Sequence, residues 1–103
     1  MLMLICYDVS TTTASGKRRL SKIAKICCNY GQRVQNSVFE CSLDAAQLIN
    51  VRAQLRATMN EKEDSLRIYR LGNKPGTAVE QYGIKSSYDP EGELFFSANH
   101  KLS

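Results

Sequence analysis

A single carboxylate ends the first apolar run of this sequence. The uncharged residues 2–7, LMLICY, are followed directly by Asp8. An ionised carboxylate at the edge of an apolar core is costly unless it is paired, capped or bound to a metal ion. Asp8 therefore has two interpretations. It accepts hydrogen bonds from amides of the loop that follows, as in an Asx turn, or it is an oxygen ligand for a divalent cation, Mg²⁺ or Mn²⁺.

A metal site built on Asp8 requires a second copy of the chain. Mg²⁺ keeps several waters and is held by one or two carboxylates, and no His or second carboxylate lies near Asp8 in the sequence. A two-fold homodimer that brings these strand ends together would present two copies of Asp8. A cation held there lowers the pKa of a bound water and polarises a phosphodiester, so catalysis at this site would rest on the metal.

Positive charge is concentrated in the first third of the chain. The sequence has 14 Lys and Arg against 10 Asp and Glu, which gives a net charge of +4. Residues 1–35 hold six of these cations and a single anion, so residues 36–103 hold eight cations and nine anions. This asymmetry indicates an anionic partner, and nucleic acid is the commonest one for a small basic domain.

A basic cluster follows the loop after Asp8. The sequence GKRR at 16–19 is expected to open a helix, where free amides and the helix dipole favour anions. Phosphate contacts from such groups are independent of base sequence. The alternative for this cluster is a solvated helix face. For Phe39, a place in the core is more typical than a role as a stacking platform for bases. The candidate phosphate-binding residues are Lys17, Arg18, Arg19 and Arg33.

The first half of the chain predicts a strand, a helix and an extended segment. The unbroken apolar run 2–7 predicts a central strand covered on both faces. Residues 17–30 have the apolar spacing of an amphipathic helix, with Gly31 placed to end it. Residues 32–43 favour extended structure, either a hairpin of two short strands or one bent strand.

The second half supplies a further helix and strand. A capping box at 44–47, DAAQ, predicts a helix that runs to about Met59. Residues 64–71 alternate well enough for a strand, and 77–84 fit one more short strand. The order predicts an α+β ferredoxin-like sandwich, βαββαβ with an extra C-terminal strand, in which two helices pack on one face of an antiparallel sheet.

Composition excludes several classes of protein. No stretch approaches the roughly 18 apolar residues of a membrane span, and the apolar start lacks the basic region of a signal peptide, so we expect a cytoplasmic protein with no membrane contact. The four cysteines show no CxxC spacing and there is a single His, which argues against a zinc site. We expect the cysteines to be small buried hydrophobes that stay reduced.

Three segments together resemble the small CRISPR-associated Cas2 family. They are YDVS at the end of the first strand, KRRLSKIAKICCNYGQRVQNSVFEC through the helix and second strand, and DSLRIYRLG at the third. The resemblance covers about residues 3–72, and the tail YDPEGELFF is similar to the subtype I-C branch. It divides the chain into a ferredoxin-like nuclease or scaffold domain at 1–72 and a C-terminal strand and tail at 73–103 that makes dimer or partner contacts.

The resemblance also implies an activity and its residues. It implies a homodimer that acts in spacer acquisition beside the CRISPR integrase. It further implies a metal-dependent endonuclease on double-stranded DNA or single-stranded RNA, with Mg²⁺ or Mn²⁺ at Asp8. An alternative role is a scaffold that bridges integrase dimers and binds duplex DNA without cutting it. By position, Tyr7 and Asp8 match the catalytic strand-end motif, Lys17, Arg18 and Arg19 match the basic residues that open the helix, and Arg33 and Phe39 match second-strand residues tied to activity.

Overall fold

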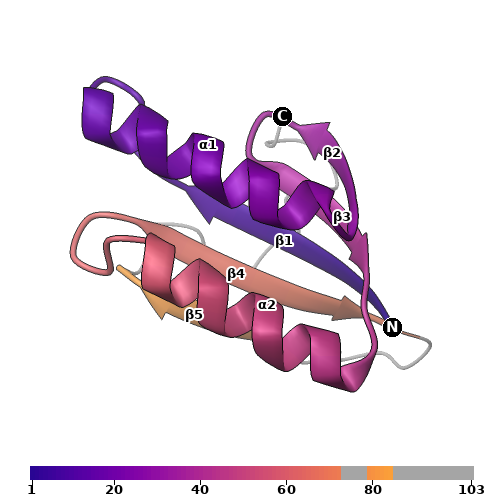
Figure 1. The fold of residues 1–103 in the computed structure, drawn as a ribbon. Helices are drawn as coiled ribbons and strands as arrows, with labels where there is room; N and C mark the ends of the chain where they lie inside the picture. The colour runs from indigo at the N-terminus through magenta and orange to yellow at the C-terminus, as the bar shows by residue number, and fades with distance from the viewer. Residues whose placement is uncertain (73–78, 85–103) are drawn as a thin grey trace, which may run out of the picture.

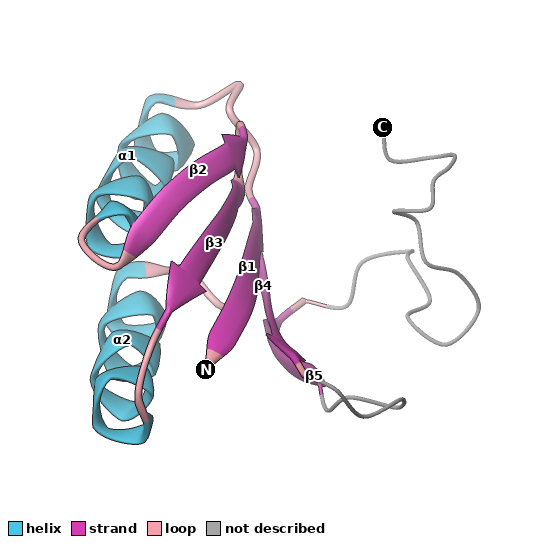
Figure 2. Ribbon diagram, turned by 90° about the vertical axis from the view of Figure 1, so that its right-hand side faces the viewer, coloured by secondary structure: helices cyan, strands magenta, loops and turns pink. Residues whose placement is uncertain are grey.

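A five-stranded antiparallel sheet carries both helices on one face. The computed structural model describes residues 1–72 and 79–84. Figure 1 shows the elements, and Figure 2 shows the two helices on one side of the sheet, whose strand order is β2-β3-β1-β4-β5. The elements are β1 (Leu2–Asp8), α1 (Ala14–Cys28), β2 (Gly31–Gln35), β3 (Val38–Ser42), α2 (Ala45–Thr58), β4 (Ser65–Leu71) and β5 (Val79–Gly83). The predicted ferredoxin-like α+β fold is confirmed.

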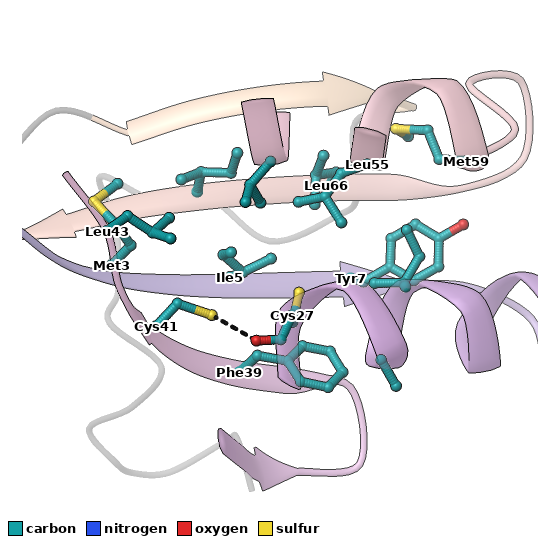
Figure 3. Packing of buried hydrophobic residues seen from close by; sticks show 14 of the residues in the cluster. Met3, Ile5, Tyr7, Cys27, Phe39, Cys41, Leu43, Leu55, Met59 and Leu66 are labelled. Carbon is teal, nitrogen blue, oxygen red and sulfur yellow. Dashed lines mark hydrogen bonds between the residues drawn. The ribbon is translucent and has the colours of Figure 1, made fainter. Parts of the chain in front are cut away.

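The core lies between the sheet and the helices. Met3, Ile5 and Tyr7 alternate along β1 and are buried on the helix side, where Figure 3 shows them packed with residues of β3 and β4. Leu4 and Cys6, which point to the opposite face, are only half-buried. The continuous apolar run predicts a strand covered on both faces, but the helices cover one face only.

Helix α1 begins three residues earlier than predicted. Thr13 is the N-cap, and its hydroxyl accepts a hydrogen bond from the Gly16 N–H at 3.0 Å. Gly16 packs against the carbonyl of Ser10, where any side chain would collide with the backbone. The polar loop thus caps the helix, and the basic cluster follows the first turn instead of opening it.

The segment 32–43 is a hairpin and not a bent strand. β2 and β3 pair in antiparallel register, with a bulge between Arg33 and Gln35 and a turn at residues 36–37. The predicted capping box of α2 is confirmed, because Asp44 and Gln47 each accept a hydrogen bond from the other's backbone N–H, at 2.7 and 3.0 Å.

The predicted additional strand is β5, which pairs with β4 of the same chain. Arg52 of α2 forms a two-point ion pair with Glu80, at 2.7 and 2.8 Å, and Arg56 stacks on the ring of Tyr82. The contacts expected of the rest of 73–103, including the tail YDPEGELFF, lie outside the described residues. Neither of the two helices that the structure describes is long and apolar enough to cross a membrane.

The cysteines are all free thiols. Cys27 and Cys41 are buried in the core, where the Cys41 thiol donates to the Cys27 carbonyl oxygen at 3.4 Å (Figure 3), whereas Cys28 is exposed. The expectation of buried cysteines therefore holds for Cys27 and Cys41 and is wrong for Cys28, because neighbouring residues of a helix point to different sides. Burial also raises the pKa of the Cys6 thiol to about 12, which keeps it protonated at neutral pH.

Candidate functional site

Asp8 is the last residue of β1, the central strand of the sheet. It lies opposite Ser65, the first residue of β4, and is exposed. Within residues 1–72 and 79–84, no hydrogen bond or ion pair engages its carboxylate. The loop amide of Thr12 donates instead to the hydroxyl of Ser10, at 3.4 Å. Hydrogen bonding to the loop therefore does not account for Asp8.

A buried hydrogen-bond network fixes the residue before it. The Tyr7 hydroxyl donates to Oδ2 of Asp64, a side chain with no exposed surface. Arg19 clamps the same carboxylate, with Nε 2.8 Å from Oδ2 and Nη2 3.0 Å from Oδ1. The backbone N–H of Asn60 adds a fourth hydrogen bond, at 3.0 Å. We call Tyr7, Arg19 and Asp64 the Tyr–Asp–Arg network; it ties β1 to α1 and to the start of β4.

The protonation states in this network follow from its geometry. Burial alone raises the pKa of Asp64, but the hydrogen bonds from Arg19, Tyr7 and the Asn60 backbone outweigh it and hold that pKa below its usual value. Burial and the hydrogen bond to Asp64 raise the pKa of Tyr7 far above its usual value. At neutral pH the network is therefore an ion pair joined to a protonated phenol, and Tyr7 in this state is not a proton acceptor.

The predicted basic residues separate into two groups. Arg19 points inward to Asp64, and only 16% of its side chain is exposed. Lys17 and Arg18 are exposed on α1, and within the described ranges no acidic side chain pairs with either of them. Their predicted role in phosphate binding fits this position, whereas the guanidinium of the half-buried Arg19 is engaged by Asp64 and Glu63.

Arg33 and Phe39 form a contact of their own. Phe39 is fully buried in the core, as its core interpretation expects. The guanidinium of Arg33 lies 5.4 Å from the centre of the Phe39 ring, and its Nε donates to the carbonyl oxygen of Asn36 at 2.9 Å. Phe39 thus positions Arg33 and presents no open face for stacking.

Asp64 is the residue of this site that the sequence does not reveal. It sits in the run EKEDS, which has the composition of a solvated turn. Its partner Arg19 lies 45 residues away, so no spacing rule joins the two. The nearest signal is the apolar alternation that starts directly after Asp64, which places it at the edge of the core.

The fit of a divalent cation depends on Asp8 alone. In the described part of the chain, no three His, Cys, Asp or Glu side chains converge on one point. An exposed carboxylate without a hydrogen-bond partner is a suitable ligand for Mg²⁺, which accepts one or two carboxylates and keeps water in its other positions. One described chain thus offers a single carboxylate at this position, and the shared site stays a prediction.

Comparisons with known proteins agree with this architecture. The family model described as "CRISPR associated protein Cas2" matches residues 1–77. The chain is 55% identical over 96 residues to the CRISPR-associated endonuclease Cas2 of Halalkalibacterium halodurans, covering 93% of this chain and 100% of that protein. It is 53% identical over 94 residues to the CRISPR-associated endoribonuclease Cas2 of Chlorobaculum tepidum, covering 91% and 98%. The crystal structure of Streptococcus pyogenes Cas2 at pH 6.5 matches with a TM-score of 0.69 and 50% identity, over 70% of this chain and 87% of that one.

Proposed function

This chain belongs to the CRISPR associated protein Cas2 family, and from that premise we propose that it is a metal-dependent endonuclease of CRISPR spacer acquisition. Relatives that share about half of its residues are named endonuclease or endoribonuclease. The proposed enzyme is a homodimer that works beside the CRISPR integrase. It cuts phosphodiester bonds of double-stranded DNA or single-stranded RNA, with Mg²⁺ or Mn²⁺ as the cofactor.

The observation that carries the proposal is the state of Asp8. Its carboxylate is exposed and has no hydrogen-bond partner within the described residues, while the backbone next to it is fixed by the Tyr–Asp–Arg network. A carboxylate at the end of a rigid strand loses little conformational freedom when it binds a cation, so its position suits a preorganised site. Two copies of Asp8 would complete it.

The chain's own residues have distinct roles in this proposal. A bound Mg²⁺ would supply Lewis acidity and a water of lowered pKa. Asp8 would hold that cation, Tyr7 would position Asp8 without touching the substrate, and Lys17 and Arg18 would hold the phosphate backbone. Because contacts to phosphate carry no base information, site choice would come from the partner proteins.

A scaffold without cleavage is the second candidate. It is favoured by one observation: within residues 1–72 and 79–84 no group of three or more His, Cys, Asp or Glu side chains forms around Asp8, as a fully equipped catalytic metal centre would have. Spacer acquisition in cells separates the two candidates. If cells that carry Asp8→Asn acquire no spacers although the variant binds duplex DNA, the result supports the nuclease. If these cells acquire spacers at the wild-type rate, the result supports the scaffold.

We expect Arg18→Ala to weaken duplex DNA binding about equally for unrelated sequences. A lost phosphate contact lowers the slope of log K against log salt by roughly one unit. Lys62→Ala is the matched control, because Lys62 is an exposed cation on the loop before β4 and its loss changes the net charge equally. Fluorescence anisotropy over a range of salt concentrations measures both slopes. Equal slopes for Arg18→Ala and the wild type would remove Arg18 from the DNA path.

A further inference from the structure

A groove lies between α1 and the edge strand β2, and Asp8 is not among the residues that line it. Figure 2 shows α1 beside β2 at this end of the sheet. The groove is open and has a volume of about 410 Å³. Its lining consists of the cations Lys17, Lys25 and Arg33, the exposed Ser21 and Cys28, and the buried Leu20 and Ala24, which we call the apolar floor.

The strand beside the groove has a free edge. Within the described residues β2 pairs only with β3, and all five of its residues are exposed. An edge strand presents unpaired N–H and C=O groups that can pair with another extended chain. The bulge between Arg33 and Gln35 limits regular pairing to a short stretch, so an added strand would also need side-chain contacts in the groove.

The charge of the groove selects an anionic occupant. No acidic residue lines it, and in the described part of the chain neither Lys17 nor Lys25 has an ion-pair partner. Arg33 is held by the Asn36 carbonyl and the Phe39 ring, neither of which neutralises its charge. The three cations therefore have no acidic partner among the described residues, and Lys17, which the proposed function places on nucleic-acid phosphates, would be shared between the two ligands.

The apolar floor and the free edge favour a peptide over a nucleic acid. Sites for single-stranded nucleic acid stack bases on aromatic side chains, and no aromatic residue lines this groove. Aliphatic side chains beside a free strand edge are instead typical of sites where a peptide adds to a sheet and places alternate side chains in a pocket.

The spacing of the cations defines the peptide. Lys17 and Lys25 are eight residues apart on the helix, which at 1.5 Å per residue is about 12 Å. Side chains four residues apart on one face of an extended chain are about 13 Å apart, and the residue midway between them points the same way. We propose that this groove binds an extended segment of a partner protein with the pattern acidic-x-apolar-x-acidic. Its acidic residues pair with the cations, its central side chain lies over Leu20 and Ala24, and its backbone adds to β2.

The test uses the full-length chain and a synthetic peptide, Thr-Glu-Thr-Leu-Thr-Glu-Thr, without divalent metal. Lys25→Glu should weaken peptide binding at least about fivefold, because it replaces an attractive charge by a repulsive one. Lys22→Glu is the matched control, since Lys22 is exposed on α1 but does not line the groove, and it should change binding by less than about twofold. Fluorescence anisotropy measures the affinities, and circular dichroism confirms that both variants fold.

Two further peptides test the mode of binding. A peptide with Lys in place of both Glu residues should not bind. A peptide with N-methyl groups on alternate backbone nitrogens should bind more weakly, because it lacks the N–H donors that would pair with β2. No binding of the acidic peptide to the wild type, or equal losses in Lys22→Glu and Lys25→Glu, would overturn the proposal. A single-stranded oligonucleotide that binds in a Lys25-dependent manner when the peptide does not would assign the groove to nucleic acid instead.

Discussion

Asp8→Asn is expected to lower the rate of divalent-dependent cleavage about a thousandfold or more. The substitution removes the charge that would hold the cation, whose Lewis acidity is worth several kcal/mol, and each ~1.4 kcal/mol corresponds to a factor of ten in rate. Cleavage of labelled duplex DNA and single-stranded RNA, with Mg²⁺ and with a chelator, measures the effect. The chelator should bring the wild type down to the rate of the variant.

The same variant should keep its fold and its affinity for nucleic acid. Asp8 is exposed and makes no hydrogen bond within residues 1–72 and 79–84, so Asn costs the folded state little. Purification of both proteins in parallel controls for a contaminating nuclease. Cleavage by Asp8→Asn at the wild-type rate would show that Asp8 takes no part in the reaction.

Asp64→Ala is expected to lower the free energy of unfolding by about 3–5 kcal/mol, the usual cost of breaking a buried ion pair by removing one partner. The loss leaves the guanidinium of Arg19 and the hydroxyl of Tyr7 without the carboxylate that now accepts their hydrogen bonds. Urea denaturation measures the change. Tyr7→Phe, which removes one hydrogen bond and keeps the ion pair, should cost only about 1–2 kcal/mol and remains measurable if Asp64→Ala fails to fold.

An exposed ion pair serves as the control for the buried one. Glu61→Gln removes the partner of Arg56, and because both side chains are 46% exposed the loss of unfolding free energy should stay below about 1 kcal/mol.

The pKa of Asp64 is lower in the folded state than in the unfolded chain. The contribution of ionised Asp64 to the free energy of unfolding is therefore present above about pH 4 and is lost as the pH falls through the folded-state pKa. The difference between wild type and Asp64→Asn should shrink in acid, and a difference independent of pH would contradict an ionised Asp64.

Local signals were sufficient to predict most of the fold. The capping box at Asp44 and the apolar spacing of both helices each report a structure that is formed within a few residues, whereas β4 is buried without alternation at residues 65–68. The start of α1 was missed because the run STTT has the composition of a loop, and the hydroxyl of Thr13 becomes a cap only once the chain turns there. Element type is set locally here, whereas this boundary depends on one side-chain contact.

The candidate site was only partly predictable for a different reason. Asp8 stands out because a charge follows an apolar run, and that signal is local. The pairing of Arg19 with Asp64 joins residues 45 positions apart through the folded sheet, so the guanidinium of one residue predicted to bind phosphate is engaged by a buried carboxylate. A basic cluster indicates an anionic partner, but only the fold determines which of its members face outward.

If two copies of Asp8 share one divalent cation, as proposed, the protein binds half an ion per chain, and metal stoichiometry measures this number. Titration of Mn²⁺ into the purified full-length protein, followed by electron paramagnetic resonance, counts the bound ions per chain. We expect one tightly bound Mn²⁺ for every two chains of the wild type, and none for Asp8→Asn. Equal binding of Mn²⁺ by wild type and Asp8→Asn, or one ion for each chain, would rule out a cation shared by two copies of Asp8.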